Sequence, residues 1–285
     1  MESTKKNINN IKESDILPIN INLQQNISCS IGQIQGNRIF MEDLYLVDKI
    51  NNLSIFAVLD GHTGKFFVGK TYDFIPKITD IILKTNSVEK IEQKVKRLFL
   101  KLDNDLFNKF KSKKGGSTIL LLYLIKNKCI FINLGDCKCI TFNNSLIFET
   151  SLHRPSEKIE SDRISKTKIP ITNNCGIIRI NDSLSVSRTI GDFNFKTTNN
   201  KYDGINSSVS CIPDLIFKKI KDNNKRFFVL GTDGLWDYIS NQKVIDIVNK
   251  HSCKNKIIKE LIMTAIQNGS NDNITVIFVE YSKVA

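Results

Sequence analysis

Apolar runs separated by short polar turns recur along the chain. The paired runs are residues 44–47 with 53–59, 117–125 with 129–134, and 139–142 with 146–148. Runs rich in β-branched and aromatic residues on either side of a tight turn are typical of antiparallel hairpins. The pattern therefore predicts a protein built largely from antiparallel strands.

A different spacing indicates helices. Apolar residues recur every three or four positions between Val88 and Leu106, which predicts an amphipathic helix over residues 87–111. Residues 65–85 form a second predicted helix, in which Pro76 is a candidate interruption. Shorter helices are expected over residues 156–167, 241–251 and 255–267. Helix pairs between groups of antiparallel strands predict an α+β fold of packed layers.

The first 25 residues differ from the rest. They are polar and rich in asparagine, so residues 1–25 are interpreted as a mobile or loosely attached arm, and residues 26–283 as one folded domain. No apolar run is long enough to cross a bilayer, the N-terminus lacks an apolar signal core, and Glu2 stands where myristoylation requires glycine. We therefore expect an intracellular protein, cytoplasmic or nuclear, without a membrane partner.

Charge and cysteine content bear on whether the protein binds nucleic acid or zinc. The net charge is +12, but lysines are scattered and asparagine is abundant too, so a composition bias explains the charge better than nucleic-acid binding. We expect no nucleic-acid partner, and a monomer as the default. The seven cysteines form no CxxC pair, which favours reduced, buried thiols over zinc or a disulfide framework.

The first hairpin carries acids at its open end. If residues 51–52 are a two-residue turn, Asp43 faces Asp60 and Glu42 faces Gly61. Like charges facing each other destabilise a sheet unless a positive charge lies between them. The sequence therefore predicts a cation site at this end of the hairpin.

Other strands repeat this arrangement. Asp60, Asp136 and Asp233 each follow an apolar run and lie beside glycine, while Asp272 directly precedes such a run. In an antiparallel sheet, the start of one strand lies at the same edge as the end of its neighbour, so these acids could share one rim. For any single residue, an ordinary Asp-Gly turn is the better explanation. The whole set, with the hairpin acids, favours a metal site.

The candidate ligands are oxygens, which suit Mg²⁺ or Mn²⁺ better than Zn²⁺. Two such ions about 3.5–4 Å apart can bridge a water and lower its pKa, giving a hydroxide for in-line attack at phosphorus. Arg38 has a guanidinium suited to a phosphate dianion, and His62 follows the Asp-Gly pair, where it could protonate a leaving alkoxide.

Short motifs identify a resemblance. In order, they are GNRIFMED (36–43), DGHTG (60–64), GGST (115–118), NLGDCK (133–138), LHRPSEKIESDRI (152–164), LSVSRTIGDFNFK (184–196), PDL (213–215), LGTDGLWD (230–237) and GSNDNITVIFV (269–279). Each motif alone is a weak pattern, but the ordered set is specific. From about residue 30 to 281, the chain resembles the metal-dependent protein serine/threonine phosphatases of type 2C, the PPM family.

The resemblance implies a four-layer α-β-β-α sandwich, in which two mainly antiparallel sheets lie between helix pairs. It also implies hydrolysis of phosphoserine and phosphothreonine in proteins at a binuclear Mg²⁺ or Mn²⁺ centre. Residues 26–283 would be the catalytic domain. Phosphorylated proteins would be its substrates.

The resemblance also assigns roles to site residues. Arg38 would bind the substrate phosphate and His62 would be the general acid. Asp60 would bridge both ions, Asp233 and Asp272 would hold one of them, and Glu42 with the Gly61 carbonyl would hold the other. Asp43 would belong to the metal site by orienting metal-bound water from behind these ligands. Asp136 and Asp237, with Asp233, can hold a weaker third ion.

Some residues have simpler explanations. Trp236 is expected to pack in the core, and Arg188 to pair with a structural acid. Asp237 could be an acid at a helix N-terminus without a metal. Two other functions stay open: a pseudophosphatase adaptor that binds phosphoproteins without turnover, and a metal-dependent nuclease with similar carboxylate chemistry.

Overall fold

Strand β4 (Leu53–Leu59) shows why the chain folds in layers. All its side chains are buried, and successive side chains of a strand point to opposite faces of the sheet. Phe56 and Val58 pack in a core between two sheets, whereas Ile55 and Ala57 pack in a second core against helices. Both faces of this strand are therefore covered.

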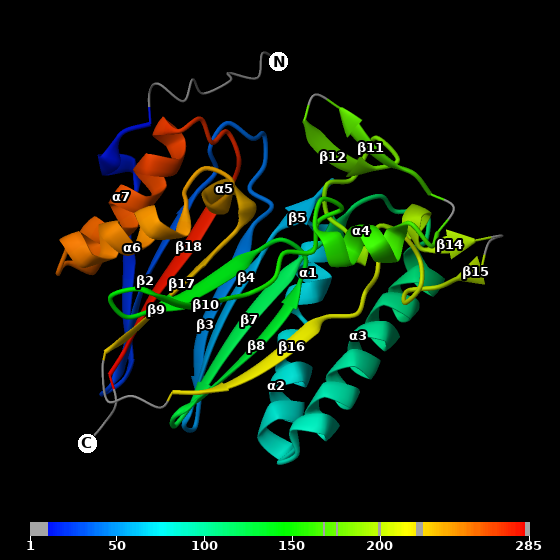
Figure 1. Cartoon of the computed structure of the whole chain (residues 1–285). Coiled ribbons are helices and arrows are strands. Elements are labelled where there is room, and N and C mark those ends of the chain that lie inside the picture. The colour runs from blue at the N-terminus through cyan, green and yellow to red at the C-terminus, as the bar shows by residue number, and fades with distance from the viewer. Residues whose placement is uncertain (1–10, 168, 175, 199–200, 221–224, 283–285) are drawn as a thin grey trace.

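The computed structural model describes residues 11–167, 169–174, 176–198, 201–220 and 225–282, and two large antiparallel sheets lie at its centre (Figure 1). One sheet has the order β1 (Ile19–Gln24), β2 (Ile27–Ile34), β18 (Ile274–Tyr281), β17 (Arg226–Gly231), β9 (Lys138–Phe142), β10 (Leu146–Glu149). The other has the order β16 (Asp214–Lys219), β8 (Lys128–Leu134), β7 (Ile119–Ile125), β4, β3 (Leu44–Ile50).

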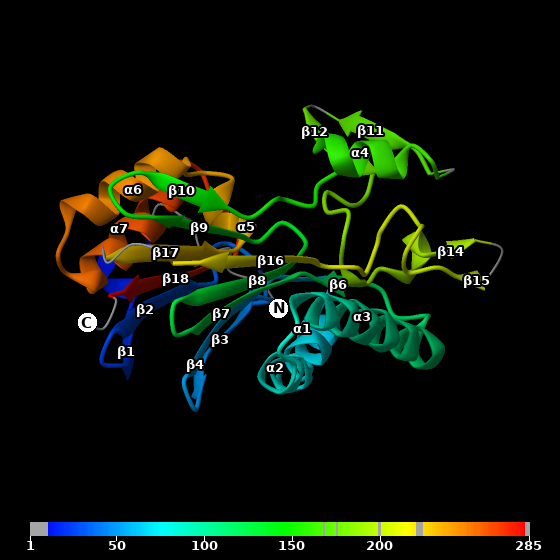
Figure 2. The same cartoon turned by 60° about the horizontal axis from the view of Figure 1, so that its bottom comes forward.

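Helices cover both outer faces, as Figure 2 shows. The five-stranded sheet packs against α1 (Lys65–Tyr72), α2 (Ile75–Lys84) and α3 (Val88–Phe110). The six-stranded sheet packs against α5 (Asp233–Trp236), α6 (Asn241–Lys250) and α7 (Lys254–Gln267). The expected α+β sandwich of four layers is therefore confirmed.

Smaller elements surround one end of the sheets. A short three-stranded sheet has the order β13 (Ile190–Gly191), β6 (Gly116–Ser117), β5 (Gly61–His62). Above β6 in Figure 2 lie α4 (Lys158–Ile164) and the hairpin of β11 (Ile171–Asn174) and β12 (Ile177–Ile180). The hairpin β14 (Thr197–Thr198) and β15 (Lys201–Tyr202) and the 3-10 turns Glu13–Asp15 and Phe193–Phe195 complete the described elements.

The predicted hairpins are confirmed, including the register of the first, in which Leu44 pairs with Leu59. The helix expected over residues 65–85 is wrong as a single element, because α1 ends at Tyr72 and α2 begins at Ile75. Pro76 lies in the first turn of α2, where its missing N–H costs no helical hydrogen bond. The break therefore precedes the proline.

The predicted N-terminal arm contains ordered structure. Residues Ile19–Gln24 form β1, which pairs with β2, and the side chain of Ile16 is fully buried. These residues belong to the edge of the six-stranded sheet, because the alternation of Ile19 and Ile21 with asparagine is a strand pattern that composition alone obscures. Residues 1–10 lie outside the described part, and the domain boundary at residue 25 stays a prediction.

Two further expectations concern membrane-spanning helices and the state of the cysteines. Among the described residues, no helix is both long and apolar enough to cross a membrane. Six cysteines are described and all are free, five of them buried and Cys253 exposed, whereas Cys175 lies outside the described residues. The expectation of free thiols is confirmed for these six, whereas the expectation of burial is confirmed for five and is wrong for Cys253.

Candidate metal centre

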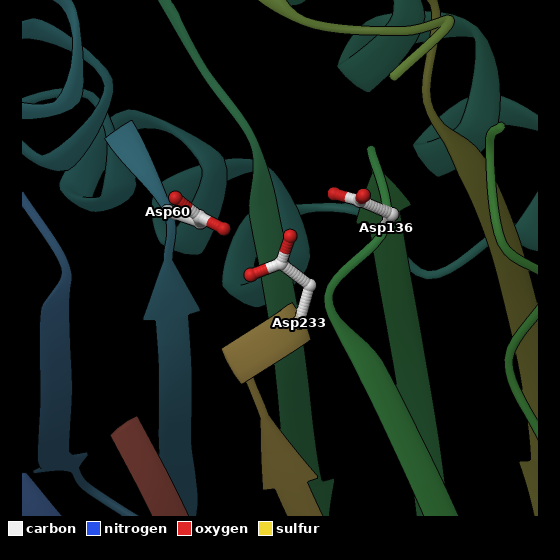
Figure 3. Close-up of side chains that lie close together, drawn as sticks. All are labelled: Asp60, Asp136 and Asp233. Atoms are coloured by element: carbon white, nitrogen blue, oxygen red, sulfur yellow. The ribbon is translucent and has the colours of Figure 1, made fainter. Parts of the chain in front are cut away.

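Three aspartates converge at the end of the sheets (Figure 3). Asp60 follows β4, Asp136 follows β8, and Asp233 begins α5 after β17. Each offers a carboxylate oxygen, and these oxygens all lie within 4.8 Å of one another. Because the strands are antiparallel and belong to two facing sheets, acids from distant parts of the chain meet at one point.

Electrostatics make this arrangement costly without a cation. Burial raises the pKa of Asp60 well above its usual value, and the charges of Asp233, Asp43, Asp136 and Asp272 raise it further. The pKa of Asp233 is raised in the same way, by burial and then by its carboxylate neighbours. Buried carboxylates of like charge are stabilised by a hard divalent ion with oxygen ligands, so this donor set fits Mg²⁺ or Mn²⁺.

Arg154 supplies a fixed positive charge beside these acids. Its Nε lies 3.0 Å from Asp136, and its Nη1 lies 2.7 Å from Asp237. Its Nη2 lies 4.0 Å from Asp233 and is buried without a hydrogen-bond acceptor. This arginine was not among the predicted site residues, although it belongs to the motif LHRPSEKIESDRI.

The two hairpin acids have different surroundings. Asp43 is 2% exposed and accepts hydrogen bonds from the hydroxyls of Thr232 and Thr275, at 2.9 and 2.8 Å. Burial raises its pKa to about 7, although the two hydroxyls lower it. Glu42 is partly exposed and accepts a hydrogen bond from the backbone N–H of Gly64. Glu42 therefore faces the open side of the site, and Asp43 lies behind it.

Arg38 and Asp272 form an ion pair at the opening. Arg38 Nη2 lies 2.5 Å from the Asp272 carboxylate, and the arginine side chain is 58% exposed. Both side chains line the cleft, and the charge of Asp272 also raises the pKa of Asp233. The guanidinium is therefore held at the mouth of the site with most of its surface free.

His62 pairs with Asp192, an acid that was not among the predicted site residues. Its Nε2 lies 2.8 and 2.9 Å from the two carboxylate oxygens of Asp192. Burial lowers the pKa of His62, but the Asp192 charge and hydrogen bond outweigh burial, and the pKa is raised. The signal was present in the sequence, because Asp192 belongs to the quoted motif LSVSRTIGDFNFK.

Most of the predicted site residues line one cleft of about 640 Å³. These residues are Arg38, Glu42, Asp60, Gly61, His62, Asp136, Asp233 and Asp272. Asp43 and Asp237 do not line it: Asp43 is buried behind the cleft, and Asp237 is paired with Arg154. The structure therefore brings together residues from across the chain around a single cavity.

Two residues expected to be structural have that role. Trp236 is 7% exposed, packs in the core under α6 and α7, and donates its indole N–H to the backbone carbonyl of Lys138. Arg188 pairs with Glu160 at 2.5 Å and with Asp214 at 2.8 Å. Neither side chain lines the cleft.

The chain is similar in sequence to known protein phosphatases. The family model described as "Protein phosphatase 2C" matches residues 27–274. Human protein phosphatase 1A is 29% identical over 269 residues, covering 87% of this chain and 69% of the relative. A probable protein phosphatase 2C from Arabidopsis thaliana is 31% identical over 267 residues, covering 86% of this chain and 65% of the relative.

Solved structures share the fold. A phosphatase from a pathogenic strain of Toxoplasma gondii superposes with a TM-score of 0.76 at 18% identity, covering 94% of this chain and 96% of that protein. At this identity the likeness concerns the fold, whereas the family match spans most of the sequence. The chain belongs to the protein phosphatase 2C family of metal-dependent serine/threonine phosphatases.

Proposed function

We propose that this chain hydrolyses phosphoserine and phosphothreonine in proteins at a centre of two Mg²⁺ or Mn²⁺ ions in the cleft. The observation that supports this most is the convergence of Asp60, Asp136 and Asp233 within 4.8 Å. When bound, the ions supply Lewis-acid stabilisation of phosphoryl oxygens and a water of lowered pKa.

Each ligand role in the proposal is assigned from the resemblance and is compatible with the position of the residue. Asp60 lies within 4.8 Å of two other carboxylates and, from the resemblance, would be a ligand of both ions. The remaining ligands would be Asp233 and Asp272 for one ion and Glu42 with the Gly61 carbonyl for the other, with Asp43 orienting a water from behind. Asp43 suits this indirect role because Thr232 and Thr275 hold its carboxylate.

Two residues of the cleft would act on the substrate itself. Arg38 would bind the phosphate through its exposed guanidinium, while Asp272 keeps that group at the mouth. His62 would donate a proton to the leaving serine or threonine oxygen. Asp192 would position the imidazole through the bond to Nε2.

A third, weaker ion at Asp136, Asp233 and Asp237 is part of the proposal. The guanidinium of Arg154 pairs with Asp136 and Asp237 in the structure, so a third ion would have to displace it. This competition would make the third ion the most weakly bound.

The test is hydrolysis of a phosphothreonine peptide with Mn²⁺ or Mg²⁺, before and after chelation. The proposal expects turnover that requires the metal. Turnover that survives chelation would contradict it, and peptide binding without turnover under either metal would identify a pseudophosphatase adaptor. Cleavage of DNA or RNA that Asp60→Asn abolishes, without peptide dephosphorylation, would identify a nuclease.

A further inference from the structure

The cleft that contains the acidic centre also has a basic rim, which we define as Lys113, Lys114 and Arg179. The two lysines follow the C-terminal end of α3 and are exposed, whereas Arg179 lies on β12 and is half-buried. Two segments far apart in sequence therefore bring three cations to one cavity.

The cations of the basic rim are not neutralised within the described part of the chain. Among the described residues, no carboxylate forms an ion pair with Lys113, Lys114 or Arg179. Lys113 Nζ lies 4.8 Å from the centroid of the Phe66 ring, and Arg179 Nη1 donates to the Ser183 carbonyl at 2.6 Å. By contrast, Arg38 and Arg154 at the acidic centre are both paired with aspartates. The rim therefore presents uncompensated positive charge.

The rest of the cleft suits an extended peptide. Ile169, Leu184 and Val186 supply apolar surface in the same cavity, beside the polar residues Asn181 and Ser183. A cavity of about 640 Å³ exceeds what a phosphate alone fills, so residues next to a bound phosphorylated side chain would meet this surface. The peptide residues nearest the basic rim would be selected by their charge.

We propose that the basic rim binds acidic side chains next to the phosphorylated residue, so that acidic phosphopeptides are the preferred substrates. This inference rests on the proposed function. It adds a selection by charge that is separate from phosphate binding, because the rim residues differ from those assigned to the phosphate and the metals.

The experiment compares phosphothreonine peptides of equal length whose flanking residues are aspartate, alanine or lysine. The readout is the ratio of kcat/KM between the aspartate and lysine peptides, because this ratio cancels changes in the metal centre. Exposed charge pairs contribute modestly, so together the three cations should favour the aspartate peptide by about tenfold. The ratio should fall as salt rises, since exposed charges are screened.

The test variant is Lys113→Glu/Lys114→Glu/Arg179→Glu, in which the ratio should fall to about one or below. The control is Lys101→Glu/Lys109→Glu/Lys243→Glu, which changes net charge equally at exposed lysines outside the cleft and should keep the wild-type ratio. An equal ratio in the wild type and the rim variant would overturn the inference. So would an equal fall of the ratio in the control.

If the protein is not a phosphatase, the preference for acidic peptides can still be measured by binding. If no peptide is turned over with Mn²⁺ or Mg²⁺, fluorescence anisotropy of the same labelled peptides still measures the rim, because the peptides stay intact. Tighter binding of the aspartate peptide that the rim variant loses would support the inference without turnover. Equal binding of all three peptides, or rim-dependent binding of a short oligonucleotide only, would refute it.

Discussion

His62 Nε2 lies 2.8 Å from Oδ1 of Asp192, although 130 residues separate them. Two further hydrogen bonds hold Asp192. The Thr189 hydroxyl donates to Oδ2 of Asp192 at 2.7 Å, and the backbone N–H of Asp192 donates to the Gly115 carbonyl. Among the described residues, no hydrogen bond occupies Nδ1 of His62. The imidazole is therefore oriented from one side and leaves its other nitrogen free.

This pairing predicts how loss of either residue depends on the leaving group. His62→Gln should reduce hydrolysis of phosphothreonine peptides by about 10²- to 10⁴-fold, because an alkoxide leaves poorly without a proton donor. Aryl phosphates need less protonation and should lose less. Asp192→Asn should show the same selectivity with a smaller loss, since the imidazole remains but is held less firmly. Steady-state kinetics on both substrates measure this.

Asp105→Asn is the matched control for Asp192→Asn, because Asp105 is an exposed aspartate on α3 outside the cleft. It should leave both substrates unaffected. Equal losses on peptide and aryl phosphate in His62→Gln would show that this histidine is not the proton donor.

The acidic centre predicts a link between metal and stability. Asp233→Asn replaces a charged oxygen with a neutral one, so metal affinity and activity should fall sharply. At a free metal concentration about 100 times the Kd, wild-type protein should gain about 2.7 kcal/mol, seen as a rise in Tm of several degrees that a chelator reverses. The variant should gain much less at the same concentration.

Calorimetric titration with Mn²⁺ and thermal unfolding with and without chelator provide the measurements. Asp105→Asn again serves as the control and should keep the wild-type rise in Tm. A wild-type metal response in Asp233→Asn would remove Asp233 from the metal centre.

The acids of this centre could be predicted from sequence because strand pairing is local. The turn at Asn51 and Asn52 fixes the register of β3 and β4, and that register places Asp43 near Asp60. Asp136, Asp233 and Asp272 each adjoin an apolar run, so they lie at strand ends whichever strands pair. Convergence at one rim then follows from antiparallel geometry.

Arg154 and Asp192 could not be predicted in the same way. Both lie outside the long strands, in segments whose paths depend on tertiary contacts rather than on a periodic pattern. The break between α1 and α2 was expected at Pro76 and not after Tyr72, because Phe74 and Ile75 continue the apolar spacing although α1 ends before them. Local pattern thus located the acids of the cleft but not the residues that pair with them.

A buried acid on α4 predicts a loss of stability at low pH. Burial alone would raise the pKa of Glu160, but hydrogen bonds and charges from Arg188 and Arg163 outweigh it and hold the pKa at about 2. Because the pKa of Glu160 in the folded state lies below its usual 4.5, its charge stabilises the fold at pH values above 4.5. The contribution to the free energy of unfolding is on the order of 3 kcal/mol. This contribution should be lost as pH falls from about 4.5 through about 2.

Urea unfolding between neutral pH and about pH 3, with chelator present throughout, measures this contribution. Glu160→Gln should be less stable than wild type at neutral pH, and the difference should shrink as pH falls. Glu157→Gln is the control, since Glu157 is exposed and forms no ion pair among the described residues. A difference that stays constant with pH would mean that the charge of Glu160 contributes nothing.

A fully buried ion pair supports the loop that carries Asp192. The Asp103 carboxylate on α3 accepts from Lys196 Nζ at 2.8 Å and from the backbone N–H of Gly191 at 2.7 Å, and both charged side chains are 0% exposed. Tyr202 also donates its hydroxyl to Asp103, at 2.7 Å. The residue directly before Asp192 is therefore anchored to α3.

Removing one partner should leave the other charge buried and unpaired. Asp103→Asn and Lys196→Met should each cost about 3–5 kcal/mol in the free energy of unfolding. The double variant should cost clearly less than the sum of the two, because neither charge then remains alone. Urea unfolding of the four proteins completes this double-mutant cycle, with Asp105→Asn as the control on the same helix. Additive losses would show that the two charges do not depend on each other. A coupled loss would instead show that this ion pair ties α3 to the segment that carries Asp192.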